Sequence, residues 1–187
     1  MTPQQVVSDA ETKFKKAQEH FEEELKKIRT GRAHPGMLDG VAVLAYGATM
    51  PLNQTSTITA PEATLLQITP FDPGNLQAIV SAIRDNPSLG LNPSDDGRVV
   101  RVPIPALTEE RRRDIVKQLG GKVEECMVAL RSVRHDALGT LNDAKKDKDI
   151  SEDDYKRYAG QVEDLMNKQK ASVDAAAKAK ETEIMTV

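Results

Sequence analysis

The chain is dominated by residues 108–146, which read TEERRRDIVKQLGGKVEECMVALRSVRHDALGTLNDAKK. Apolar residues recur there every three or four positions, the spacing that places them along one side of an α-helix. They are Ile115, Leu119, Val123, Cys126, Leu130, Val133, Ala137, Leu141 and Ala144. Thr108 is a typical N-cap, and Glu109 and Glu110 suit the first turn. We therefore predict one helix of about 38 residues. Because glycine is costly inside a helix, we expect a bend or the close approach of another backbone at Gly120-Gly121.

Two more segments have the same periodicity. The first runs from Pro3 to about Thr30, with Thr2 as N-cap and Gly31 as the stop. Its apolar residues are Val7, Ala10, Phe14, Ala17, Phe21, Leu25 and Ile28. The other begins after Ser151, and its periodic residues are Tyr155, Tyr158, Val162, Leu165, Gln169, Val173 and Ala176. Since helices with one narrow apolar face are stable only when that face is buried, the three segments predict a three-helix bundle. We expect Phe14, Phe21 and Cys126 in its core.

Between these helices the chain changes character. Nine of the 10 prolines and seven of the 11 glycines lie between residues 31 and 105. Short runs rich in β-branched residues predict strands, and one stretch has helical spacing. The strands are expected at 41–44, 56–59, 64–68 and 98–102, a further short one at 89–93, and the helix at 75–85. The sequence thus predicts an α+β protein: a bundle of residues 1–30 and 107–187, interrupted by a mixed α/β domain of residues 31–106.

The two connections between the bundle and the insert are candidates for a hinge. One contains glycine and the other contains two prolines, a composition compatible with bending at a defined place. The residues we expect to form the hinge are Thr30, Gly31, Pro103, Pro105 and Ala106.

Composition argues against several classes of protein. The 187 residues carry a formal net charge of -3, three histidines and a single cysteine. One cysteine and scattered histidines are too few for a typical zinc site, and no phosphate-binding glycine loop or nucleophile elbow is present. No apolar run of about 18 residues predicts a membrane span. We expect a soluble, cytoplasmic, monomeric protein that is not an enzyme and uses no metal or cofactor.

The basic residues of the long helix are the main candidate site. They include Arg112, Lys122, Arg131, Arg134 and His135, of which the last three share one helical face. Guanidinium groups suit bidentate contact with phosphate, but such a face is often only solvated or paired with nearby acids such as Asp136. Three hypotheses stay open on these residues: an RNA-binding protein, a helical adapter that binds protein surfaces, and a hydrolase with convergent carboxylates.

Several short motifs, in order along nearly the whole chain, resemble those of the bacterial ribosome recycling factor family. The motifs are KIRTGRA at 27–33, LDG at 38–40, LGLNP at 89–93, RVPIP at 101–105, LTEERR at 107–112, RSVRHDA at 131–137 and KDKDISEDD at 146–154. The resemblance is looser between residues 46 and 86. His135 is a departure, because many members of the family have arginine there.

The resemblance implies an L-shaped molecule in which a three-helix bundle and a small α/β domain meet at a flexible elbow. It implies a factor that acts after translation termination, binds the RNA of the large ribosomal subunit, and splits the ribosome with elongation factor G and GTP. The residues that match the family's RNA-contacting arginines are Arg29, Arg32, Arg131 and Arg134. With Arg112, Lys122 and His135, they form the predicted RNA-binding set.

Overall fold

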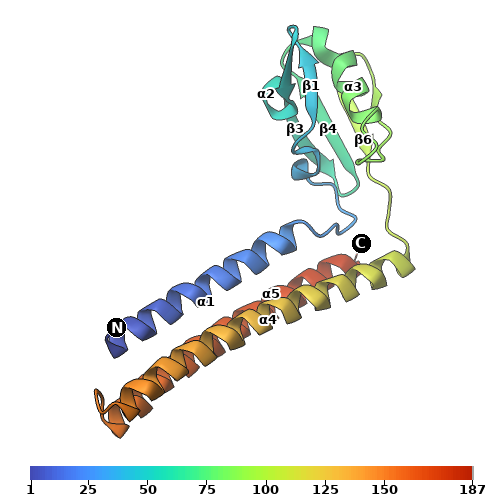
Figure 1. Ribbon diagram of the computed structural model, residues 1–187. Coiled ribbons are helices and arrows are strands. Elements are labelled where there is room, and N and C mark those ends of the chain that lie inside the picture. The colour runs from blue at the N-terminus through green and yellow to red at the C-terminus, as the bar shows by residue number, and fades with distance from the viewer. Residues whose placement is uncertain (187) are drawn as a thin grey trace. The chain divides into compact units, whose positions relative to one another are not determined.

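The computed structural model describes residues 1–186, which form two compact units. One unit consists of residues 1–29 and 109–186, and the other of residues 30–108. In Figure 1 the first unit is blue at one end of the chain and yellow to red at the other, and the second runs from lighter blue through cyan to green. The predicted α+β class is confirmed, with long helices and a small, separate sheet-containing unit.

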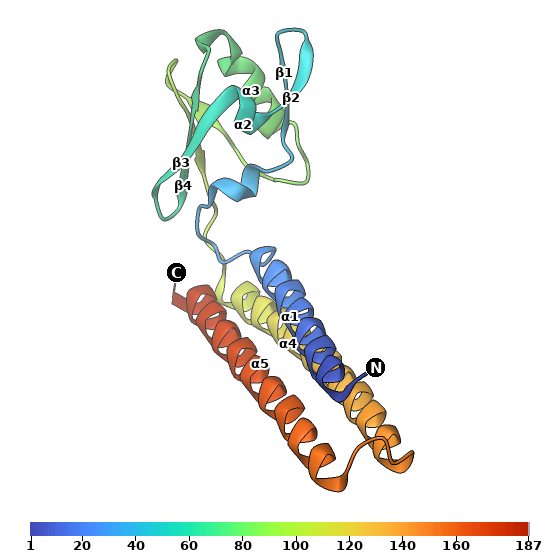
Figure 2. The same cartoon turned by 90° about the vertical axis from the view of Figure 1, so that its left-hand side faces the viewer.

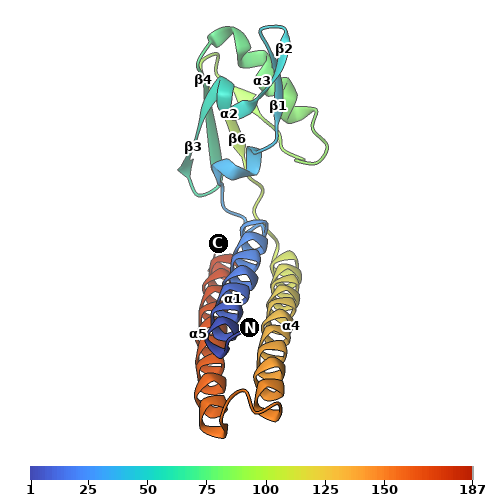
Figure 3. The same ribbon diagram turned by 60° about the vertical axis from the view of Figure 1, so that its left-hand side comes forward.

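The first unit is a bundle of α1 (Pro3–Lys26), α4 (Glu109–Lys146) and α5 (Glu152–Thr186). Each of the three helices contacts the other two, and they lie side by side in Figures 2 and 3. Their apolar stripes face inward, so Phe14, Phe21 and Leu130 are at most 2% exposed. Burial of these stripes supplies most of the stability of the helices.

The helix ends follow the chemistry of the capping residues. Thr2 and Gln5 form a capping box, in which the Thr2 hydroxyl accepts from Gln5 N at 3.2 Å. Ser151 caps α5 by accepting from Asp154 N at 3.0 Å. Helix α1 ends at Lys26, before the expected Thr30, because its last turn tightens into bonds such as Ile28 N to Leu25 O at 3.1 Å.

Helix α4 continues through Gly120 and Gly121 without a break. Both glycines are exposed, and a Cβ added at either would meet no neighbouring atom within 4 Å. The expected close approach of another backbone at these glycines is therefore wrong.

The second unit combines two small sheets with short helices. Strands β1 (Ala42–Ala45) and β2 (Ala48–Pro51) form a hairpin, followed by α2 (Leu52–Thr55). The other sheet is antiparallel, in the order β3-β4-β6-β5, and is accompanied by α3 (Leu76–Arg84). Its strands are β3 (Ser56–Glu62), β4 (Leu65–Pro70), β5 (Ser94–Asp95) and β6 (Val100–Pro103).

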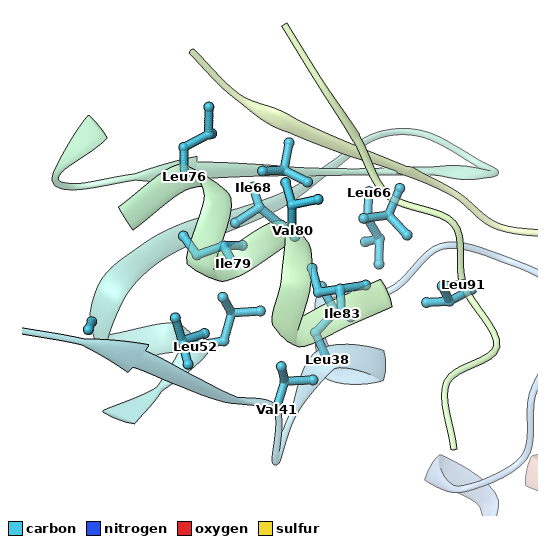
Figure 4. Packing of buried hydrophobic residues seen from close by; sticks show 14 of the residues in the cluster. Leu38, Val41, Leu52, Leu66, Ile68, Leu76, Ile79, Val80, Ile83 and Leu91 are labelled. Carbon is cyan, nitrogen blue, oxygen red and sulfur yellow. The ribbon is translucent and has the colours of Figure 1, made fainter. Parts of the chain in front are cut away.

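Helix α3 supplies the centre of this unit's core. Ile79 and Ile83 are fully buried and belong to one cluster with Leu66 and Ile68 of β4, as Figure 4 shows. The strand expected at 89–93 is absent: Leu89 N bonds Asn86 O in a turn, and Gly90 has a φ of 58°. The two-residue strand β5 follows it instead.

Candidate nucleic-acid interface

The centre of the predicted RNA-binding set is the exposed side of α4. Arg131, Arg134 and His135 occupy positions i, i+3 and i+4, so they share one helical face. The side chains of Arg131 and Arg134 are 56% and 43% exposed, and His135 is also exposed. We refer to these three residues as the α4 basic face. Its groups are accessible to a large partner, and its two guanidinium groups suit phosphate oxygens.

Each arginine of this face already contacts a glutamate. Arg134 Nε lies 2.6 Å from Glu163 Oε1 of α5, and Arg131 pairs with Glu124 two turns earlier on α4. Among the ion pairs of residues 1–186, none joins either arginine to the predicted partner Asp136. Glu124 and Arg131 are seven residues apart, about two helical turns, and this spacing could have suggested their pairing. No local signal identifies Glu163, because it lies on another helix.

Lys122 is part of a link between α4 and α1. Its Nζ lies 3.3 Å from Glu24 Oε2 and 3.4 Å from Glu125 Oε2. The hydrogen bond with Glu24 is the largest cause of a raised Lys122 pKa. The hydrogen bond with Glu125 and the charges of both carboxylates raise it further. Glu24, which bonds both Lys27 and Lys122, has a lowered pKa. The structure thus gives Lys122 a structural contact in addition to its predicted contact with RNA.

Arg112 also has a contact within the bundle. Its Nη1 donates to the carbonyl oxygen of Met185 at 3.3 Å, close to the end of α5. A guanidinium group at a helix C-terminus satisfies a terminal carbonyl and interacts favourably with the helix dipole. Arg112 therefore fastens the end of α5 to the start of α4, and its Nε is buried with no hydrogen-bond partner in the described part of the chain.

Arg29 and Arg32 lie on either side of the boundary between the two units. Both are exposed, and neither forms an ion pair with any of the residues that the structure describes. Their guanidinium groups differ in this respect from those of Arg131 and Arg134. No internal carboxylate has to be displaced before Arg29 or Arg32 contacts a phosphate.

The predicted hinge residues differ in how firmly the fold holds them. Thr30 and Gly31 are buried, Gly31 has a φ of 80°, and a Cβ there would lie 3.3 Å from Leu107 Cγ. Pro103 pairs with Leu65 in the sheet. Pro105 and Ala106 are exposed and outside any regular element. Of the second connection, the stretch outside the sheet is the part best suited to bending.

The hydrolase hypothesis gains little from the surface of the molecule. A hollow along the outer side of α4 is lined by Glu109, Glu110, Arg113, Asp114 and Lys117. All five side chains come from one helix and are exposed, so no opposite wall excludes water. In the described residues, no cluster of three or more His, Cys, Asp or Glu side chains could hold a metal ion. None of the described helices is long and apolar enough to cross a membrane.

Comparison with known proteins shows where this chain belongs. The family model "Ribosome recycling factor" matches residues 21–185. The chain is 48% identical to the ribosome-recycling factor of Halalkalibacterium halodurans, over 98% of each chain. It is 47% identical to that of Pseudomonas putida, over 97% of this chain and 98% of the relative.

Solved structures agree with these sequence matches. A solution structure of a ribosome recycling factor has a TM-score of 0.77 and 36% identity, and covers 100% of this chain and 99% of its own. A second, with a TM-score of 0.65 and 39% identity, covers 99% and 100%. It is the T. thermophilus ribosome recycling factor, described with E. coli elongation factor G bound to the E. coli post-termination complex. By its sequence and its fold over nearly its whole length, the chain belongs to the ribosome recycling factor family.

Proposed function

We propose that this protein binds the large ribosomal subunit after translation termination and, with elongation factor G and GTP, splits the ribosome into subunits in the cytoplasm. The observation that carries the proposal is the family match, which extends over 98% of both chains at 48% identity. A related factor, 39% identical, is described together with elongation factor G and the post-termination complex. The protein itself performs no covalent chemistry, and its partner hydrolyses GTP.

Arg131 and Arg134, with Arg29 and Arg32, are proposed to contact phosphates of ribosomal RNA. All four occupy positions that match the family's motifs, and Arg29, Arg32 and Arg131 are exposed while Arg134 is about half-exposed. Contacts to phosphates position a protein on RNA without reading its sequence. The absence of tryptophan and the 3% content of aromatic residues agree with recognition of backbone and shape. His135 provides a neighbouring donor. Arg112 and Lys122 contribute less, because Arg112 Nε is buried and Lys122 contacts two glutamates.

The connections between the two units are proposed to flex during splitting. Pro105 and Ala106 are exposed and outside the sheet, whereas Gly31 needs its left-handed backbone and the space beside Leu107. Gly31→Ala is expected to strain this connection, because a residue with a side chain is disfavoured at positive φ. Splitting should then fall more than binding to the large subunit. Equal losses in both would contradict the flexing proposal.

Sedimentation of post-termination ribosomes tests the function directly. Subunits should appear only when this protein, elongation factor G and GTP are all present. Splitting without the protein, or with GTP omitted, would refute the proposal.

A variant with both Arg131→Ala and Arg134→Ala tests the RNA contact. Each change is expected to weaken large-subunit binding by about 1.5–3 kcal/mol, the range for a hydrogen bond to a charged group. The slope of log affinity against log salt should become shallower by about 0.7–0.9 for each phosphate-binding arginine replaced. Arg157→Ala is the matched control, since Arg157 forms a similar exposed ion pair with Asp154 at 2.9 Å. A salt slope near zero in the unaltered protein would favour the adapter hypothesis instead.

A further inference from the structure

The two arginines of the α4 basic face, Arg131 and Arg134, differ from Arg29 and Arg32 in that glutamates of the same molecule pair with them. Glu163 contacts Arg134 from α5, with 2.6 Å between Oε1 and Nε, and Glu124 contacts Arg131 along α4. Arg29 and Arg32, by contrast, form no ion pair with residues 1–186. In the absence of RNA, two of the four proposed phosphate-binding arginines are therefore each paired with a carboxylate.

A carboxylate and a phosphate compete for the same donors of a guanidinium group. Both present anionic oxygens, and both accept the charge-assisted hydrogen bonds that arginine offers. The competing pairs are accessible, because the side chains of Arg134 and Glu163 are 43% and 38% exposed and those of Arg131 and Glu124 are 56% and 65% exposed. Pairs this exposed are weak, and each lowers the affinity of a competing anion by roughly 1.4- to 5-fold. A well-placed phosphate can therefore displace them.

This competition affects poorly fitting RNA most strongly. Non-specific binding of RNA depends on diffuse positive charge and counterion release, and a face whose arginines are neutralised offers little of either. An RNA that places two phosphates against Arg131 and Arg134 gains charge-assisted bonds that offset the opening of both pairs. An RNA that approaches without this geometry meets two glutamates, which repel its phosphates.

We propose that Glu163 and Glu124 are specificity-determining residues, which occupy Arg134 and Arg131 until correctly placed phosphates displace them and so suppress binding to other RNA. The proposal rests on the proposed contact of these arginines with ribosomal RNA. The proposal is also compatible with RNA binding by a chain whose formal net charge is -3. Local pairing, rather than net charge, sets the potential that an RNA meets at this face.

The test compares two kinds of RNA target with glutamine variants. Glu163→Gln, Glu124→Gln and the double variant are titrated against purified large subunits and against polyuridylic acid, over a series of salt concentrations. The double variant should bind polyuridylic acid about 2- to 25-fold more tightly, since the effects of two pairs of this strength multiply. Its salt slope should be steeper, and its gain on large subunits smaller, so that the ratio of the two affinities falls.

Glu23→Gln removes one negative charge and is therefore the net-charge control for each single variant, Glu163→Gln and Glu124→Gln. Glu23 lies on the exposed side of α1, where it forms a similar pair with Lys26 at 3.3 Å. This control should leave both affinities unchanged. The proposal is overturned if the double variant binds polyuridylic acid no more tightly, if it gains equally on both targets, or if Glu23→Gln produces the same gain.

Loss of folding and failure of the proposed function can both be separated from failure of this inference. Glu124 contacts a residue of its own helix, so Glu124→Gln keeps the bundle contacts even if Glu163→Gln weakens them. If large-subunit binding survives loss of both arginines, the proposed RNA contact is wrong. If the arginine variants lose binding while the glutamine variants behave like the unaltered protein, only the specificity inference is wrong.

Discussion

Replacement of Gln169 by leucine should stabilise the bundle. Gln169 is only 6% exposed and lies on the apolar stripe of α5, between the buried Val162 and Val173. Its Oε1 has no hydrogen-bond partner in the part of the chain that the structure describes. A buried acceptor without a partner costs about 1–3 kcal/mol, and leucine fills a similar volume without a polar atom. We therefore expect Gln169→Leu to raise the free energy of unfolding by about 1–3 kcal/mol.

Urea unfolding followed by helical circular dichroism measures this change, because most helical residues belong to the bundle. Gln169→Ala is the informative partner variant: it also removes the oxygen but leaves a void, and voids in a packed core are destabilising. Gln18→Leu is a surface control, since Gln18 is partly exposed and its Nε2 donates to Ser172 Oγ at 2.8 Å. If Gln169→Leu is as destabilising as Gln169→Ala, the amide has a partner such as an ordered water, and the reasoning fails.

Two further predictions concern other parts of the chain. The Asp96 carboxylate accepts hydrogen bonds from the backbone N–H groups of Val99 and Arg98 and pairs with Arg101, with 2.6 Å between Oδ2 and Nη1. These contacts hold the pKa of Asp96 well below its usual value. A depressed pKa in the folded state contributes stability above the unfolded-state value near 3.8, and this contribution disappears as pH falls through the folded-state pKa. Asp96→Asn should therefore flatten the loss of stability between pH 5 and about 2 in acid titrations, and an unchanged profile would contradict this account. Gly120→Ala should raise the free energy of unfolding by about 1 kcal/mol, because the added methyl group meets no neighbour, and a lower urea midpoint would show that the site needs glycine.

The long helices were predictable because each combines an uninterrupted apolar period with a capping residue. The prediction for residues 108–146 is confirmed as α4, Glu109–Lys146, and α5 begins directly after Ser151 as expected. The end of α1 was less predictable, since the apolar spacing continues to Ile28 although the backbone leaves the helix after Lys26. Apolar spacing reports which face is buried, and the exact end depends on local hydrogen bonds.

The second unit was harder to predict because its elements are short. Strand β2, Ala48–Pro51, lacks the alternation of a half-buried strand and was missed, although Tyr46 and Gly47 form the turn that pairs it with β1. The run at 89–93 has apolar Leu89 and Leu91 in alternation, as a strand does, but it folds as a turn because Gly90 takes a positive φ. Short apolar runs carry too little periodic information to separate strands from loops.

The partners of the arginines could not be predicted, because they depend on how the helices align. Glu163 is 29 residues from Arg134, and Met185 is 73 residues from Arg112. Both contacts arise only once α5 runs back along α4, and no local spacing encodes them. Sequence reasoning could identify basic residues suited to phosphate, but only the packed bundle shows that Arg112 has a buried Nε and that Lys122 bonds two glutamates, whereas Arg131 is exposed.

This division of roles along α4 has a mechanical consequence. One continuous helix carries the Arg112 contact near its start and Arg134 more than 20 residues later, a distance of about 33 Å at 1.5 Å per residue. Its apolar stripe is packed against α1 and α5 over this length, so bending it would break core contacts. A force applied at the start of α4 therefore displaces the α4 basic face as well, instead of being absorbed between them. Under the proposed function, the bundle transmits displacement to the ribosomal RNA, while the exposed ion pairs of Arg131 and Arg134 allow its contacts to form and break.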